Sequence, residues 1–90
     1  MPTLVIYMRR RSGAGNRVGF TVTARIGHAV VRNRVRRRLR EIYRLHEGEL
    51  RRGADLVIVA RGRSVHAPYQ ALERDFLAAC RKLDLLEERP

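Results

Sequence analysis

Two stretches near the start of the chain have the apolar pattern of β-strands. Residues 3–10 read TLVIYMRR, and residues 17–25 read RVGFTVTAR, with an apolar side chain at every second position from Val18 to Val22. Such alternation is typical of a strand with one buried face. The intervening segment RSGAGN, residues 11–16, contains two glycines and is typical of a turn. We therefore predict two strands joined as an antiparallel hairpin.

Apolar residues then recur with helical spacing between Ala29 and His46. At about 100° per residue, one stripe of this predicted helix contains Val31, Val35, Leu39, Ile42 and His46. Gly48 is a natural stop for the helix. The stripe is expected to pack against the sheet, and most of the charged positions around it are arginine.

A third strand and a second helix complete the pattern. Residues 55–61, DLVIVAR, are nearly all apolar, which predicts a central strand covered on both faces. Residues 69–83 have apolar i+3 and i+4 spacing, which predicts a second amphipathic helix. The tail, residues 84–90, is expected to fray or to form a short turn. The order β-β-α-β-α predicts a single α+β domain over residues 1–90, with both helices packed on a small sheet.

The net charge of +11 is confined to the first half of the chain. Residues 1–46 contain twelve basic residues and one acid, Glu41, whereas residues 47–90 contain eight of each. Such asymmetry is typical of a protein that binds a polyanion. Nineteen of the twenty basic residues are arginine, whose planar guanidinium makes bidentate contacts with phosphate and stacks on bases.

The predicted helix 29–46 concentrates this charge. Its arginines lie at both edges of the apolar stripe and on the outer surface: Arg32, Arg36 and Arg40 at one edge, Arg38 at the other, and Arg34 and Arg37 outward. An ordinary solvated helix mixes both signs of charge, because like charges four residues apart destabilise a helix by a few tenths of a kcal/mol per pair. We therefore favour a nucleic acid partner over solvation alone.

Other chemistry in the sequence is sparse. The three histidines lack metal-ligand spacing, and no paired carboxylates or Ser/His constellation indicates a protein active site. The single cysteine, Cys80, cannot form an internal disulfide, which fits a reducing cytoplasm. The alternatives are a structural or ribosomal-type RNA-binding protein, a DNA-binding module in which only Asn33 could read bases, and a basic helix on a membrane surface.

Residues 21–41, TVTARIGHAVVRNRVRRRLRE, closely resemble the signature of the bacterial ribonuclease P protein subunit, approximately S-V-S-K-K-x-G-x-A-V-x-R-N-R-x-K-R-x-x-R. The direct matches are Gly27, Ala29, Val30, Arg32, Asn33, Arg34, Arg37 and Arg40. Arg25 and Arg36 stand where the family usually has lysine, and Ala24 replaces another common lysine. The strand ending at Arg61 and the Tyr-containing helix after it also resemble the family, so the resemblance covers nearly the whole chain.

The resemblance implies a left-handed strand–helix–strand crossover through the arginine-rich helix, although crossovers in general are right-handed in about 98% of cases. It also implies a subunit of an endoribonuclease. Such a subunit binds a catalytic RNA and the 5′ leader of precursor tRNA, and it assists tRNA maturation by hydrolysis. Mg²⁺ would be held mainly by the RNA, and no catalytic residue or metal ligand is expected in the protein.

The resemblance also implies the RNA-binding residues: Arg25, Arg32, Asn33, Arg34, Arg36, Arg37, Arg38, Arg40 and Arg61. A leader groove would contain Tyr7, Phe20, Arg36 and Arg40. The two aromatic residues could stack on unpaired bases at ~1–3 kcal/mol per base or could pack in the core. We favour the core for Phe20 and a groove-facing position for Tyr7.

Members of the resembled family usually begin with a further basic segment, including a helix that carries groove aromatics. This sequence starts at the first predicted strand. Either the start is truncated or the groove lacks one wall, and we expect weaker leader binding than in an extended chain. An apolar face left open in this way would favour self-association or a second protein segment in the same groove.

Overall fold

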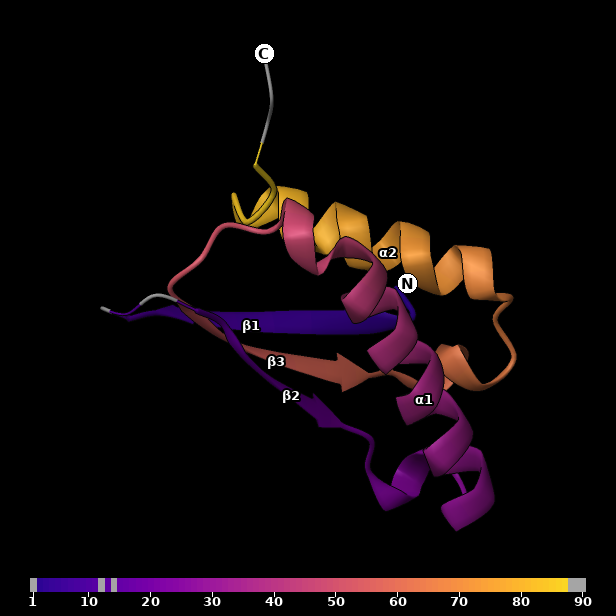
Figure 1. Cartoon of the computed structure of the whole chain (residues 1–90). Helices are drawn as coiled ribbons and strands as arrows, with labels where there is room; N and C mark the ends of the chain where they lie inside the picture. Colours follow the sequence, from indigo (N-terminus) through magenta and orange to yellow (C-terminus); the bar gives the residue numbers. More distant parts are fainter. Residues whose placement is uncertain (1, 12, 14, 88–90) are drawn as a thin grey trace.

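The computed structural model describes residues 2–11, 13 and 15–87 (Figure 1). The strands and main helices are β1 (Leu4–Arg10), β2 (Arg17–Thr21), α1 (Ala29–His46), β3 (Ala54–Ala60) and α2 (Tyr69–Lys82). Three short 3₁₀ turns lie between them: η1 (Ala24–Ile26), η2 (Glu47–Glu49) and η3 (Gly62–Val65). The predicted α+β class is confirmed, and both predicted helices form with nearly the expected bounds.

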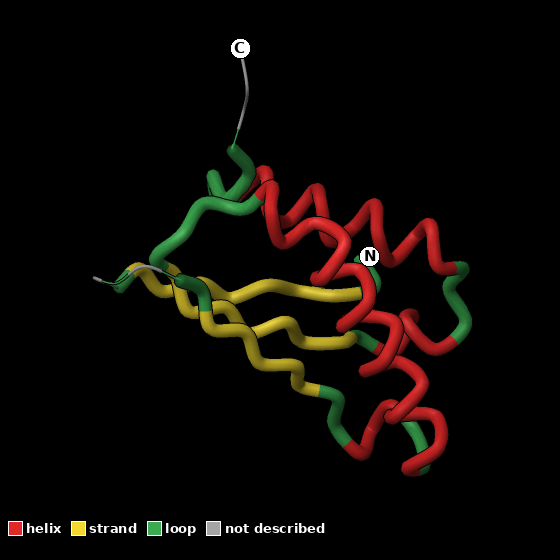
Figure 2. The backbone as a smooth tube through the Cα atoms, viewed as in Figure 1, coloured by secondary structure: helices red, strands yellow, loops and turns green. Residues whose placement is uncertain are grey.

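The sheet order is β1-β3-β2 (Figure 2). β1 pairs antiparallel with β3, and β2 pairs parallel with β3. The predicted hairpin is therefore wrong, because β3 lies between the two strands that the hairpin would have joined. β3 is the most apolar of the three strands. In the central position, it forms backbone hydrogen bonds along both of its edges. The chain crosses from β2 to the parallel strand β3 through α1, and the left hand of this crossover stays a prediction from the resemblance.

The sheet has one covered face and one open face. Leu4 and Ile6 of β1 and Leu56 and Ile58 of β3 are buried on the covered face. The opposite side of β3 is not covered, since the side chain of Val57 is 40% exposed. The prediction that β3 is covered on both faces is therefore wrong. Both helices pack over the same face, and this leaves the other face open to solvent.

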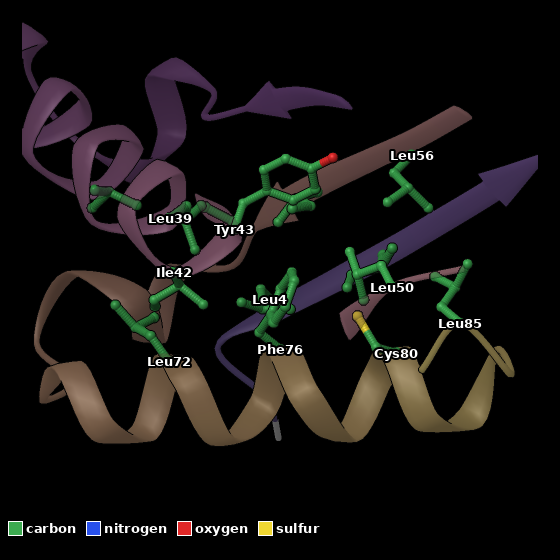
Figure 3. Close-up of a cluster of buried hydrophobic side chains, with 14 of the residues drawn as sticks. Leu4, Leu39, Ile42, Tyr43, Leu50, Leu56, Leu72, Phe76, Cys80 and Leu85 are labelled. Carbon is green, nitrogen blue, oxygen red and sulfur yellow. The ribbon is translucent and has the colours of Figure 1, made fainter. Parts of the chain in front are cut away.

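The core forms where the two helices meet the covered face. Figure 3 shows Leu39, Ile42 and Tyr43 of α1 converging with Leu72 and Phe76 of α2. The predicted stripe of α1 supplies the buried residues Val35, Leu39 and Ile42, while Tyr43 was not predicted. Each fully buried large apolar side chain stabilises the fold by about 1.5–3 kcal/mol. This packing fixes which sides of α1 remain available at the surface.

Hydrogen bonds hold both ends of the described chain. The first residues bind to α2, and the last ones bind to η2 and the residues after it. The backbone N–H and the hydroxyl of Thr3 donate to Asp75 Oδ2 at 2.8 and 2.7 Å. Near the other end, Leu86 forms a bridge with Leu50, and Leu85 is buried. Of the two expectations for the tail, the short turn is found at Leu83 and Asp84, and residues 85–87 are not frayed; residues 88–90 lie outside the described part.

Candidate nucleic-acid interface

The outer surface of α1 carries a set of arginines with no acidic partner. Arg34, Arg37, Arg40 and Arg44 are exposed, whereas Arg32, Arg36 and Arg38 are partly buried. Within the described residues, none of these guanidinium groups forms an ion pair with a carboxylate. The charge of α1 is therefore not neutralised by the protein itself. An anionic partner would gain the full attraction of this surface.

Two of these arginines are oriented by uncharged neighbours. Arg36 donates from Nη1 to Asn33 Oδ1 at 3.1 Å, one helical turn away. The guanidinium carbon of Arg40 lies 5.9 Å from the ring centroid of Phe20, within the range of a cation–π interaction. Both arginines keep their positive charge uncompensated while their side chains are held in place.

Arg38 differs from the other arginines of the helix. Its Nη1 donates to the carbonyl oxygen of Ala67 at 3.2 Å, in the segment that precedes α2. The side chain therefore connects α1 to the start of α2. Its predicted contact with RNA would have to use the remaining donors of the guanidinium.

Further predicted residues lie at the carboxyl ends of the parallel strands β2 and β3. Arg25 belongs to η1, which follows β2, and Arg61 comes directly after β3; both are exposed. Since η1 packs against both the start of α1 and η3, these segments lie together with the helix N-terminus. Arg25, Arg32, Asn33, Arg34 and Arg61 are therefore brought to one end of the molecule.

Tyr7 belongs to a different surface, the open sheet face. Strand alternation and register place nine residues on this face: Val5, Tyr7, Arg9, Arg17, Gly19, Thr21, Asp55, Val57 and Val59. Tyr7 is 61% exposed and pairs across to Val57, which in turn pairs with Gly19. Tyr7, Val57 and Gly19 thus form a row across the three strands. A Cβ atom added at Gly19 would meet no atom within 4 Å, so the Gly19 end of this row is flat. The row could accept a planar base against Tyr7.

The predicted leader groove is not assembled as one surface. Phe20 pairs with the buried residue Ile58, so its ring points to the covered face beside Arg40. Tyr7 pairs with Val57 and points to the opposite face. The structure thus brings Phe20 together with Arg40 and separates both from Tyr7. Binding of leader by these residues stays a prediction.

Sequence reasoning missed the charged residues that accompany Tyr7. Arg9 and Arg17 flank Asp55 at one end of the open sheet face, and Arg17 Nε lies 3.9 Å from Asp55 Oδ1. A second arginine, Arg11, lies closer, with Nε 2.9 Å from the same oxygen. The two-residue spacing from Tyr7 to Arg9 is a sequence signal that could have identified the first of these neighbours.

Two titratable side chains, His46 and Cys80, lie next to the core and have shifted pKa values. His46 lies between Glu49, 2.5 Å from Nδ1, and Glu73, 2.8 Å from Nε2. Burial alone would lower the pKa of His46, but the hydrogen bonds to Glu73 and Glu49 outweigh it and raise the pKa above its usual value. Burial raises the pKa of the Cys80 thiol to about 12, so this cysteine is not a nucleophile at neutral pH.

The side chains that the structure describes do not fit a magnesium site. Across residues 2–11, 13 and 15–87, no group of three or more His, Cys, Asp or Glu side chains could hold a metal ion. The surface that carries the predicted site is lined by guanidinium groups, whereas Mg²⁺ prefers oxygen ligands. Among the same residues, no helix is long and apolar enough to cross a membrane.

The fold and the uncompensated arginines of α1 define a small, basic α+β protein with a cationic helix at its surface. The sequence profile of the family Ribonuclease P matches residues 1–84. The chain belongs to the bacterial ribonuclease P protein family. It is 39% identical over 85 residues to the ribonuclease P protein component of Natranaerobius thermophilus, covering 94% of this chain and 74% of the relative. It is 42% identical over 80 residues to that of Finegoldia magna, covering 89% and 68%.

Solved structures of family members have the same fold. The RNase P protein of Staphylococcus aureus superposes with a TM-score of 0.82 at 20% identity, over 93% of this chain and 77% of that protein. The RNase P protein of Thermotoga maritima gives a TM-score of 0.80 at 24% identity, over 88% and 76%. These likenesses establish the α+β fold with its mixed three-stranded sheet.

Proposed function

We propose that this chain binds the RNA subunit of ribonuclease P and the 5′ leader of precursor tRNA, and so assists Mg²⁺-dependent removal of the leader. The observation that carries the proposal is the set of α1 arginines without carboxylate partners. Each contact with a phosphate releases counterions from the RNA, which favours binding and makes it dependent on salt. A cytoplasmic location belongs to the proposal and agrees with the free thiol of Cys80.

The two surfaces suit two parts of the RNA. The arginines of α1 and those at the carboxyl ends of β2 and β3 suit the phosphate backbone of folded RNA, because guanidinium groups make bidentate contacts with phosphate. The open sheet face suits unpaired nucleotides, because Tyr7 offers an exposed ring with Arg9 on the same strand and Arg17 on β2, across β3. Stacking on an aromatic side chain is tolerant of sequence, as binding of many different leaders requires.

The chemical step is assigned to the RNA in this proposal. When bound to the RNA, Mg²⁺ would stabilise the attacking and leaving oxygens of the phosphodiester. The protein would neutralise nearby phosphates and hold the leader beside the cleavage site. Both contributions raise the affinity for substrate and lower the Mg²⁺ concentration needed to screen the RNA.

Reconstitution with a bacterial ribonuclease P RNA tests the proposal. Cleavage of precursor tRNA is measured with RNA alone, with protein alone and with both, across a range of Mg²⁺ concentrations. We expect the complete mixture to cleave at the 5′ side of the mature tRNA at lower Mg²⁺ than RNA alone, and the protein alone to be inactive. A structural RNA-binding protein would bind the RNA without changing leader-dependent cleavage, and that outcome would refute the proposal.

A further inference from the structure

Phe20 lies in contact with two residues of α1 that are three positions apart. The guanidinium of Arg40 lies over its ring at 5.9 Å from the centroid. The ring of Tyr43 meets it at a centroid distance of 6.2 Å and an interplanar angle of 82°. Tyr43 is only 5% exposed, so it forms a fixed support for the Phe20 ring. The position of Arg40 is therefore linked to the core through one aromatic side chain.

The ring of Phe20 is poorly placed to stack on a base itself. Phe20 is partly buried on the covered face, where α1 packs against β2. Arg40 lies over the ring, and Tyr43 contacts it edge to face. A base could reach the covered ring face only by displacing the guanidinium. This geometry argues against a direct contact between Phe20 and RNA bases.

A cation–π contact suits an arginine that must bind phosphate. The attraction to the ring does not use the N–H donors, which lie in the guanidinium plane and remain able to form a bidentate contact. An ion pair would neutralise the charge, as at Arg11, whose Nε lies 2.9 Å from Asp55 Oδ1. Contact with Phe20 thus orients the Arg40 side chain without neutralising its charge.

We infer that Phe20 is a positioning residue that holds Arg40 ready for a phosphate of the bound RNA. Restricting a long side chain before binding reduces the conformational entropy that is lost on binding. The inference rests on the proposed function, since it takes RNA phosphate as the ligand of Arg40. It assigns Phe20 to the RNA-binding site through Arg40 and not as a stacking platform.

The test is a double-mutant cycle in the reconstituted holoenzyme, with Phe20→Leu, Arg40→Gln and the double variant. Leucine keeps an apolar side chain on β2 but removes the ring. We expect Phe20→Leu to weaken the affinity for the RNA subunit or for precursor tRNA about two- to five-fold, the range of an exposed cation–π contact. In the Arg40→Gln background, the same change should have no further effect. Phe20→Tyr should restore the wild-type affinity because it keeps the ring.

Two controls separate positioning from loss of packing. Val18→Ala, two residues earlier on β2, removes packing from the same face without touching Arg40, so it should lower the melting temperature and leave affinity unchanged. NMR of the Arg40 side chain in the free protein should show ring-current shifts that disappear in Phe20→Leu. Equal affinity losses for Phe20→Leu in both backgrounds would overturn the inference while leaving the proposed function intact. Failure of the wild-type chain to bind RNA would refute the proposed function, and with it the ligand assigned to Arg40.

Discussion

Tyr7 and Phe20 lie on opposite faces of one sheet, although both belong to strands that pair with β3. Tyr7 is solvent-exposed beside Val57, whereas Phe20 contacts Arg40 and Tyr43 under α1. The two aromatic residues therefore serve different surfaces. The open sheet face offers the exposed ring of Tyr7, and the helix side offers positive charge. Substitutions on the two surfaces should therefore change different measured quantities: the affinity for the leader at Tyr7, and the salt dependence of binding at the arginines of α1.

Removal of the Tyr7 ring should affect only substrates that carry a leader. Tyr7→Ala is expected to cost about 1–3 kcal/mol of affinity for precursor tRNA in the holoenzyme, because a stacking partner is lost. Binding of mature tRNA should be unchanged. Tyr7→Phe keeps the ring and serves as the matched control. Parallel titrations of precursor and mature tRNA measure the difference, and an equal loss for both would contradict a leader contact at Tyr7.

Loss of the arginines at one edge of α1 should change the salt dependence of binding. With Arg36→Ala and Arg40→Ala combined, the slope of log affinity against log salt should become shallower by about 0.7–0.9 for each phosphate contact removed. Arg81→Ala is the control, since Arg81 is an exposed arginine on α2. Affinities measured over a salt series test this. If precursor and mature tRNA lose the same affinity, the two arginines contact the RNA subunit or the tRNA body and not the leader.

His46 should make the fold more stable at low than at high pH. Its raised folded-state pKa means that the protonated ring contributes its full stabilisation below about pH 6.5 and loses it as pH rises through the folded value. His46→Gln should therefore lower the free energy of unfolding by on the order of 1–2 kcal/mol at pH 5.5, and by less at pH 9. Urea denaturation at both pH values measures the change, with the exposed residue His66→Gln as control. A loss that does not vary with pH would show that His46 acts only through packing on Phe76.

Asp75 should make the fold more stable at neutral pH than in acid, the opposite of the pH dependence expected for His46. The backbone N–H and the hydroxyl of Thr3 hold the pKa of this carboxyl below its usual value. Its stabilisation is therefore present above about pH 4 and disappears as pH falls through the lower folded value. Asp75→Asn should destabilise the fold by about 1–3 kcal/mol at pH 7, and the difference should vanish in acid. Asp84→Asn, at a far more exposed carboxylate, should show little effect at either pH.

Local sequence patterns predicted the helices and strands of this fold better than they predicted which strands pair with each other. The helical stripe of α1, the run of strand-forming residues in β1 and the alternation in β2 depend on neighbouring residues, so they could be recognised along the chain. The position of β3 between the other strands depends on contacts between distant segments. The short glycine-containing turn favoured a hairpin locally, but the apolar β3 gains ladder bonds on both edges in the observed sheet.

The same distinction applies to the candidate site. The contact from Arg36 to Asn33 spans three residues of one helix and could have been predicted from spacing alone. The contacts from Arg38 to Ala67 and from Arg40 to Phe20 join different elements. Their existence depends on how α1 crosses the sheet. Sequence therefore identified which residues carry charge, whereas the tertiary structure determines how each charge is held.

The central position of β3 also has a consequence during synthesis on the ribosome. A nascent chain that ends before residue 54 contains β1, β2 and the whole of α1, yet it contains neither of the two strand pairings. The cationic helix thus emerges before the sheet that supports it can assemble, close to ribosomal RNA. Completion of the fold waits for the last strand, because both ladders require it. The arginine-rich segment therefore lacks its supporting sheet until β3 becomes available for pairing.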